Sequence, residues 1–341
     1  MTRVFSEGFE MQDRVGMTYS TSSFITTSAP RSGLCSLGFG RGGSLTIPVS
    51  DLTEAYIRVG FKCYSMTDTV SGNFYIAWRK GTTVLGRVYI DFTTNSFLEA
   101  QVSTTTQDTG SIAIVVGPYF FSIELHIKID DATGVIETKV DGIADATFSG
   151  DTKPGADSNF DNIYMLASAG GLGGGDIGCQ VDDIAINDTA GAVDNSWTGD
   201  GHIIVIKPTI DTATLELTPS AAVDHYTLVD DIPADGDTTY VEGSVDDEED
   251  IYDMAACGLG DVVITRIWTE ARARDTASTG KSIALITKAS GGAEVSGGDV
   301  PLLNTYTKKI LGAEQLVNPV DSAAWEVADI DALQGGVRTR P

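Results

Sequence analysis

The sequence predicts an all-β protein, and three of its properties carry this prediction. Its 341 residues include 38 glycines, and Ser, Thr and Asp are frequent. The apolar residues come in short runs, which is typical of short strands separated by many turns. Within these runs, β-branched and aromatic residues alternate with polar ones at the period of two that a strand requires. The length suffices for two ordinary domains or one large one.

Strands are predicted throughout the N-terminal half. Two of them, over 121–129 and 134–142, are joined by a turn and form a hairpin with one face exposed to solvent. A strand over 201–208 is expected to close the first domain, because Pro208 and the threonine-rich 209–214 mark a boundary. The predicted domains are therefore 1–205 and 206–341. Further strands are expected over 45–48, 55–63, 74–79 and 86–92.

The C-terminal half repeats this pattern in kind but not in sequence. A short helix is expected over 327–333, because Gly335 and Gly336 follow it as a natural stop. The glycine-rich run 170–175 is interpreted as a flexible connection, since a phosphate-binding loop requires a helix directly after its glycines. The strands predicted in this half cover 226–229, 262–271, 282–288 and 305–311.

The charge of the chain limits its partners. Lys and Arg number 22 against 48 Asp and Glu, so the formal net charge is −26. This argues against nucleic acid or an anionic membrane surface as the main partner. No basic, apolar leader is expected at residues 1–7, and no apolar stretch approaches the roughly 20 residues of a membrane helix. The cysteines lack a Cys-x-x-Cys pair and are predicted to be reduced, mostly buried thiols. They are Cys35, Cys63, Cys179 and Cys257.

The run 181–191 is the most informative single segment. It is predicted to be a strand that ends in a turn. Asp182 and Asp183 are expected at the strand end, pointing to opposite faces because neighbouring strand residues alternate. Trp197, in the closing segment 195–200, is expected to pack beneath the turn. The residues expected to shape the reversal are Asn187, Asp188 and Gly191.

Three blocks of sequence, 7–10, 124–142 and 182–200, resemble in order and spacing the concanavalin A-like (laminin-G-like) jelly-roll domain of tailed-bacteriophage virion structural proteins. The segment 318–337 resembles the closing part of the second β domain in the same phage proteins. The resemblance implies a concanavalin A-like jelly-roll sandwich followed by a second, smaller β-sandwich domain.

The resemblance also implies a function. We expect a non-enzymatic virion structural protein exposed on the particle, such as a head fibre, a capsid decoration protein or a tail-associated protein. Its partners would be other capsid or tail proteins, and repetition on a particle suggests a homo-oligomer, for example a trimer. It would be assembled in the host cytoplasm. The first alternative is a carbohydrate-binding receptor adhesin of the tail or fibre that takes a host-surface glycan, and the second, less favoured, is a glycoside hydrolase.

No catalytic, cofactor-binding or metal-binding residue is assigned. Glycoside hydrolases on this fold place carboxylates two apart on one strand face, and no Glu-x-Asp-x-Glu triplet is present. The nearest candidates are the pair Asp182 and Asp183 and the run 248–250. Aromatic side chains could stack on sugars, with Trp197 and Tyr119 as candidates, but a core role is favoured for a large aromatic residue. No Ser-His-Asp or metal arrangement follows from the three histidines, His126, His202 and His225.

An acidic stretch at 224–261 contains 13 acidic residues and no Lys or Arg. Within it, 231–242 nearly fits a calcium loop, but Pro233 stands where a ligand should be, and a turn between strands is favoured. The interpretation of the stretch is a solvated loop centred on 246–250. Two alternatives for the stretch stay open, namely that it binds a divalent cation such as calcium loosely or that it faces a basic partner.

Overall fold

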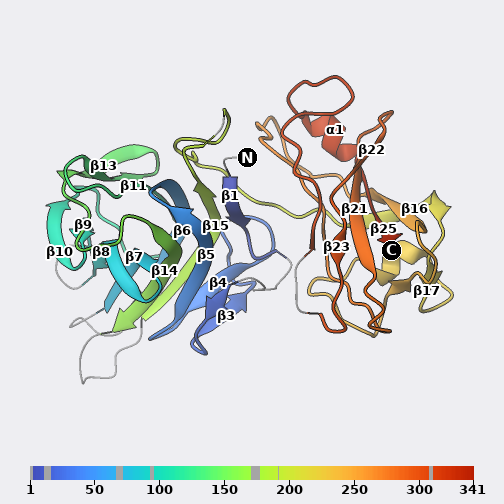
Figure 1. Ribbon diagram of the computed structural model, residues 1–341, viewed down its shortest axis with the longest axis horizontal. Helices are drawn as coiled ribbons and strands as arrows, with labels where there is room; N and C mark the ends of the chain where they lie inside the picture. The colour runs from blue at the N-terminus through green and yellow to red at the C-terminus, as the bar shows by residue number, and fades with distance from the viewer. Residues whose placement is uncertain are drawn as a thin grey trace. The chain divides into compact units, whose positions relative to one another are not determined.

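The computed structural model of the protein describes residues 3–10, 17–66, 72–92, 96–169, 177–190, 192–306 and 310–341. Contacts divide the chain into two compact units, Met1–Ile204 and Val205–Pro341, which we call unit 1 and unit 2 (Figure 1). The predicted domain boundary after residue 205 lies next to this division. The glycine-rich run 170–175 lies outside the described residues.

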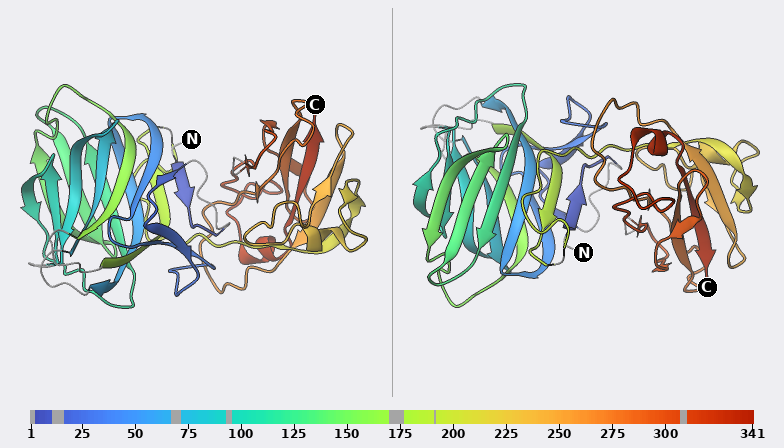
Figure 2. Two further views of the ribbon diagram at one scale, coloured as in Figure 1. Left: turned by 90° about the horizontal axis from the view of Figure 1, so that it is seen from below. Right: turned by 90° about the horizontal axis from the view of Figure 1, so that it is seen from above.

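Unit 1 contains two antiparallel sheets, which we call sheet A and sheet B. Sheet A follows the order β13-β12-β11-β6-β15-β4-β3, with β1 beside β15, and sheet B the order β10-β9-β8-β7-β14-β5-β2. Figure 2 shows their strands, coloured blue to green, running side by side. The strands of sheet A are β1 (Arg3–Glu7), β3 (Ser23–Thr26), β4 (Ser36–Phe39), β6 (Glu54–Met66), β11 (Phe121–Lys128), β12 (Gly134–Val140), β13 (Ile143–Gly150) and β15 (Ile177–Asn187). Those of sheet B are β2 (Thr18–Tyr19), β5 (Ser44–Leu52), β7 (Gly72–Lys80), β8 (Thr83–Asp91), β9 (Leu98–Val102), β10 (Thr105–Thr109) and β14 (Phe160–Ala169).

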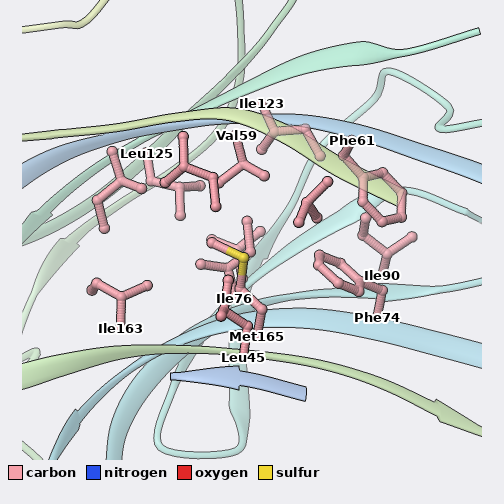
Figure 3. Close-up of a cluster of buried hydrophobic side chains, with 14 of the residues drawn as sticks. Leu45, Val59, Phe61, Phe74, Ile76, Ile90, Ile123, Leu125, Ile163 and Met165 are labelled. Atoms are coloured by element: carbon pink, nitrogen blue, oxygen red, sulfur yellow. The ribbon is translucent and has the colours of Figure 1, made fainter. Parts of the chain in front are cut away.

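The core of unit 1 lies between these two sheets. Along strands such as β7 and β12, alternate residues point inward, so apolar side chains of both sheets interdigitate and are removed from water (Figure 3). This is a jelly-roll sandwich of two antiparallel sheets, in agreement with the fold that the resemblance implies. Cys35, Cys63 and Cys179 are buried free thiols within it, as expected, while Cys257 of unit 2 is half-buried. Core residues labelled in Figure 3 include Val59, Phe61, Ile123 and Leu125 of sheet A and Leu45, Phe74, Ile76 and Met165 of sheet B.

Unit 2 is the smaller β-sandwich. Its main sheet follows the order β16-β19-β25-β21-β22, with β23 beside β21. The short pair β20–β24 forms part of a second layer, where Ala271 packs against Ile283 and Leu285. The elements are β16 (Pro208–Leu215), β17 (Thr218–Pro219), η1 (His225–Leu228), β18 (Val241–Glu242), β19 (Glu249–Met254), β20 (Glu270–Ala271), β21 (Ser282–Lys288), β22 (Glu294–Ser296), β23 (Val300–Pro301), β24 (Ile310–Leu311), α1 (Val327–Asp331) and β25 (Gln334–Arg340).

Several predictions for unit 2 need correction. The predicted strand 226–229 lies mostly in the 3₁₀-helix η1, because the Asp211 carboxylate accepts the backbone N–H groups of His225 and Tyr226 at 2.7 Å and turns the chain there. The strand predicted over 262–271 is reduced to two isolated bridges and β20. The strand expected over 201–208 is absent among the described residues before β16. The helix prediction is confirmed by α1, where Glu326 and Asp329 form a capping box.

Candidate functional site

The outer face of sheet B gathers arginine, tyrosine and amide side chains, and we call it the sheet B face. The same alternation that turns Phe74, Ile76 and Trp78 into the core turns the neighbouring residues of β7 outward. The side chains of this face are half-buried or buried among one another, except for the exposed Thr106. They are Thr46 of β5, Asn73, Tyr75, Ala77 and Arg79 of β7, Arg87, Tyr89 and Asp91 of β8, Glu99 and Gln101 of β9, Thr106 of β10, and Asn162 and Tyr164 of β14.

Strand register places these residues in rows that cross the sheet. One row takes a residue from each strand, and a second row beside it contains the directly paired Tyr75 and Tyr89. Directly opposed side chains lie about 4.5–5.5 Å apart at Cβ, so each row is a continuous surface of contacts. The first row runs through Thr106, Gln101, Arg87, Ala77, Tyr164, Thr46 and Thr18.

The two arginines of the face lie against tyrosine rings. Arg79 stacks over Tyr164, with 3.8 Å between Cζ and the ring centroid. Arg87 lies over Tyr89 at 4.8 Å and over Tyr75 at 5.1 Å. The Tyr75 and Tyr164 rings are 5.9 Å apart at their centroids and tilted by 56°. These contacts hold the guanidinium groups and the rings in one arrangement.

Hydrogen bonds fix the remaining polar groups. Arg87 Nε donates to Gln101 Oε1 at 2.5 Å, and Gln101 Nε2 donates to Glu99 Oε2 at 2.9 Å and Thr106 Oγ1 at 3.1 Å. On the other side, Arg79 Nε donates to Asn162 Oδ1 at 2.9 Å. A side chain held at several points loses little conformational entropy when a ligand binds, so the face is preorganised.

Burial raises the pKa of both Tyr75 and Tyr89. For Tyr75, nearby Tyr164 adds to the rise while the two arginines oppose it; for Tyr89, Asp91 adds to it while Arg87 opposes it. Both phenols therefore keep their protons at neutral pH. The face presents aromatic surfaces together with phenol, amide and guanidinium donors, a combination suited to a ligand rich in hydroxyl groups.

The acidic pair singled out in the sequence lies elsewhere, inside β15. Its carboxylates accept hydrogen bonds from one loop: Asp182 Oδ2 from the backbone N–H of Arg31 at 2.8 Å, and Asp183 Oδ1 from Ser32 Oγ at 2.6 Å. A bulge between Asp182 and Ala185, with φ of 49° at Asp183, interrupts the alternation. The prediction that the two carboxylates end the strand and point to opposite faces is therefore wrong.

Both carboxylates are completely buried. Burial, with the charge of Asp183 nearby, raises the pKa of Asp182 to about 8. Burial opposes ionisation of Asp183 as well, but hydrogen bonds from His202, Ser32 and the Ile203 backbone, together with the charge of Arg31, hold its pKa below the usual value. The pair carries about one negative charge against Arg31 at neutral pH. This arrangement supports the structural interpretation of the pair.

The outer face of sheet A is crossed by residues 196–203, which we call the strap. The carboxylate of Asp183 anchors one end of it, since it accepts the Ile203 backbone N–H at 2.7 Å. Glu124 Oε1 of β11 accepts the Gly199 N–H at 2.7 Å. Further anchors are Arg58 Nη1 to Gly199 O at 3.0 Å and Asn187 Nδ2 to Ser196 O at 2.9 Å. The strap occupies part of sheet A, whereas the sheet B face is built only from strand residues.

Trp197 belongs to the strap and does not lie beneath the turn as expected. It packs edge-on against Tyr56 at 5.5 Å and His126 at 6.0 Å, and Lys139 lies over its ring at 3.8 Å. His126 is stacked on Tyr56 at 4.2 Å, in agreement with its predicted packing or surface role. Tyr119, the other candidate for sugar stacking, is 75% exposed.

The acidic stretch of unit 2 is partly structural. Asp250, predicted in a solvated loop, is completely buried on β19. Its carboxylate accepts the Leu217 backbone N–H at 2.9 Å and contacts His225 Nδ1 at 2.7 Å and Tyr252 OH at 2.9 Å. Within the exposed part, basic residues of the same unit pair with the acids: Arg274 with Asp237, Lys281 with Asp246, and Arg340 with Asp247.

In the near-calcium loop, Thr239 Oγ1 lies 3.0 Å from carboxylate oxygens of both Asp231 and Asp235. This agrees with a turn. Over the described ranges, no group of three or more His, Cys, Asp or Glu side chains is placed to hold a metal ion. Over the same ranges, none of the helices has the length and apolar character needed to cross a membrane.

Sequence reasoning missed the sheet B face. The signal was present, since Asn73, Tyr75 and Arg79 alternate with core residues along β7, and Arg87 and Tyr89 do so along β8. What the sequence did not contain was the register that brings these residues into one row.

No protein-family model matches the chain, and no curated protein matches it. Among solved structures, the alginate lyase Aly36B is 14% identical, with a TM-score of 0.39, over 55% of this chain and 93% of its own. A carbohydrate esterase from Shiga toxin-encoding bacteriophage phi24B is 12% identical, with a TM-score of 0.41, over 55% and 98%. The catalytic domain of a glycoside hydrolase family 131 protein from Coprinopsis cinerea is 12% identical, with a TM-score of 0.40, over 59% and 100%.

Proposed function

We propose that unit 1 binds a carbohydrate on the sheet B face and that the protein acts without catalysis. The observation that carries this proposal is the row of Gln101, Arg87 and Tyr164 flanked by Tyr75 and Tyr89, held by stacking and hydrogen bonds. Sugar rings present apolar faces that pack on aromatic rings, and hydroxyl groups that pair with amide and guanidinium groups.

The absence of catalysis is part of the proposal. The Glu99 carboxylate already accepts hydrogen bonds from Gln101 and from Thr106 Oγ1 at 2.8 Å, which suits a positioning role better than that of a free acid or base. The buried pair Asp182 and Asp183 is closed to a substrate. Release of reducing ends from a bound polysaccharide, lost on Glu99→Gln, would overturn this part.

The experiment for binding uses the whole chain and a panel of immobilised glycans and polysaccharides. Tyr75→Ala and Tyr164→Ala should each weaken binding about fivefold to tenfold, because an aromatic contact contributes on the order of 1 kcal/mol. Tyr56→Ala is the matched control, since it removes a tyrosine from the outer face of sheet A. Equal losses for all three variants, or no binding to any glycan, would refute the proposal.

We further propose that the chain is a virion component, a capsid or tail protein that forms a homo-oligomer. The support is the resemblance of segments 7–10, 124–142 and 182–200 to phage structural proteins, and glycan binding fits the adhesin form of that role. Mass spectrometry of purified particles should detect the protein, and light scattering should give more than one copy per assembly. Its absence from purified particles would refute the virion role without affecting carbohydrate binding.

A further inference from the structure

We propose that the ligand of the sheet B face is an anionic polysaccharide, whose carboxylate or sulfate groups bind the guanidinium groups of Arg79 and Arg87. This inference rests on the proposed carbohydrate binding and adds the chemical class of the ligand.

Neither Arg79 nor Arg87 contacts a carboxylate in the part of the chain that the structure describes. Arg87 donates to the neutral Gln101 Oε1, and Arg79 donates to Asn162 Oδ1 and, at 3.4 Å, to Thr46 Oγ1. Other arginines do find carboxylates: Arg31 with Asp183 at 2.8 Å, Arg338 with Glu294 at 2.6 Å and Arg340 with Asp299 at 3.0 Å.

The composition makes this pair of arginines informative. The chain has 48 acidic residues for 22 basic ones, so more than two carboxylates exist for every cation. Two arginines on neighbouring strands that both lack a carboxylate therefore form a local positive site on a negatively charged protein. Such a site attracts an anion, while the net charge of −26 disfavours non-specific binding of a polyanion elsewhere.

The guanidinium groups also keep donors for a ligand. Their contacts with Tyr164, and with Tyr75 and Tyr89, are made to aromatic rings and not to hydrogen-bond acceptors. Among the described residues, Nη1 of Arg79 and both Nη atoms of Arg87 have no hydrogen-bond acceptor. The planar fork of a guanidinium group matches the oxygens of a carboxylate or sulfate.

Charge is unevenly distributed along the sheet B face. Arg87 lies opposite Ala77 on β7, and Arg79 lies two residues further along the same strand. Diagonal neighbours on one face are about 7–8 Å apart, so two successive acidic groups of one polymer could reach both. The carboxylates of the face itself lie toward the opposite end, where Asp91 pairs with Asn73 and Glu99 pairs with Tyr89. Beyond Arg79, the Asp161 carboxylate accepts a hydrogen bond from Asn162 Nδ2 and lies 3.7 Å from Lys80 Nζ. An anionic chain would therefore be drawn to Arg79 and Arg87 rather than to the Asp91 end.

The test is isothermal titration calorimetry of the full chain with polygalacturonate and with dextran sulfate. The neutral controls are carboxyl-reduced polygalacturonate and dextran. We expect at least one polyanion to bind at least about tenfold more tightly than its neutral counterpart. This preference should shrink when NaCl is raised from about 50 to about 500 mM, because salt screens the charges. The polyanion preferred identifies carboxylate or sulfate as the group bound.

Variants locate the site. Arg79→Gln and Arg87→Gln should each reduce polyanion affinity about tenfold or more, because each removes a charge-assisted hydrogen bond. Lys128→Gln, which removes one positive charge from sheet A, should change it less than about twofold. Equal binding of charged and neutral polymers, reduced by Tyr75→Ala, would overturn the inference and leave the proposed function standing. Failure of every polymer and of the glycan panel to bind would overturn both.

Discussion

Replacement of Asp183 by alanine should unfold unit 1 far more readily than replacement of an exposed acid. The side chain is completely buried and accepts hydrogen bonds from Arg31 Nη1 at 2.8 Å, Ser32 Oγ at 2.6 Å and the Ile203 backbone at 2.7 Å. Breaking a buried ion pair from one side costs about 3–5 kcal/mol. An additional buried donor without an acceptor costs about 1–3 kcal/mol, and alanine at a positive φ costs about 1 kcal/mol more.

We therefore expect Asp183→Ala to lower the free energy of unfolding of unit 1 by roughly 5 kcal/mol, a large part of the 5–15 kcal/mol typical of a domain. Asp183→Asn, which keeps an oxygen acceptor, should lose about half as much. Asp188→Ala is the control, because its carboxylate caps only an exposed turn at Ala190. Urea unfolding, followed by hydrogen exchange in peptides of β6 and β15, measures the free energy of unfolding of unit 1 separately from that of unit 2. A loss below about 1 kcal/mol for Asp183→Ala would refute the structural interpretation of the pair.

Three further predictions concern stability. Burial raises the pKa of Glu10 to about 7, so folded unit 1 holds a proton that the unfolded chain releases near pH 4.5. The free energy of unfolding of unit 1 should therefore fall as the pH rises from about 5 to 7. Urea titrations at both pH values should show that Glu10→Gln reduces this fall by on the order of 2–3 kcal/mol, and an unchanged fall would contradict the assignment. Ile76→Ala, in the core, should cost about 2–5 kcal/mol in the same assay, against little for the exposed Ile210→Ala, and similar losses would contradict the core assignment. Asp250→Ala should destabilise unit 2 by about 3–5 kcal/mol, read by exchange in β19 and β25, while the exposed Asp246→Ala should cost under about 1 kcal/mol.

Two of the predictions that failed share a cause. Asp183 was assigned an orientation from regular alternation, and Asp250 was assigned to solvent because its neighbours are acidic. In both cases a partner distant in sequence decides the outcome: Arg31 for Asp183 and His225 for Asp250. A carboxylate can be buried when such a partner compensates for its lost hydration, and local composition carries no information about that partner.

The amino-acid sequence alone determined the all-β fold of this protein, because alternation of apolar and polar residues decides locally which side chains of a strand face the core. It therefore also determined that Tyr75 and Arg79 lie on one face of β7 and Arg87 and Tyr89 on one face of β8. Only the tertiary structure decided that these residues form one surface with Tyr164, from a strand far along the chain. Register between distant strands depends on packing and bulges across the whole sandwich, and these are properties of the folded sheets rather than of any single segment.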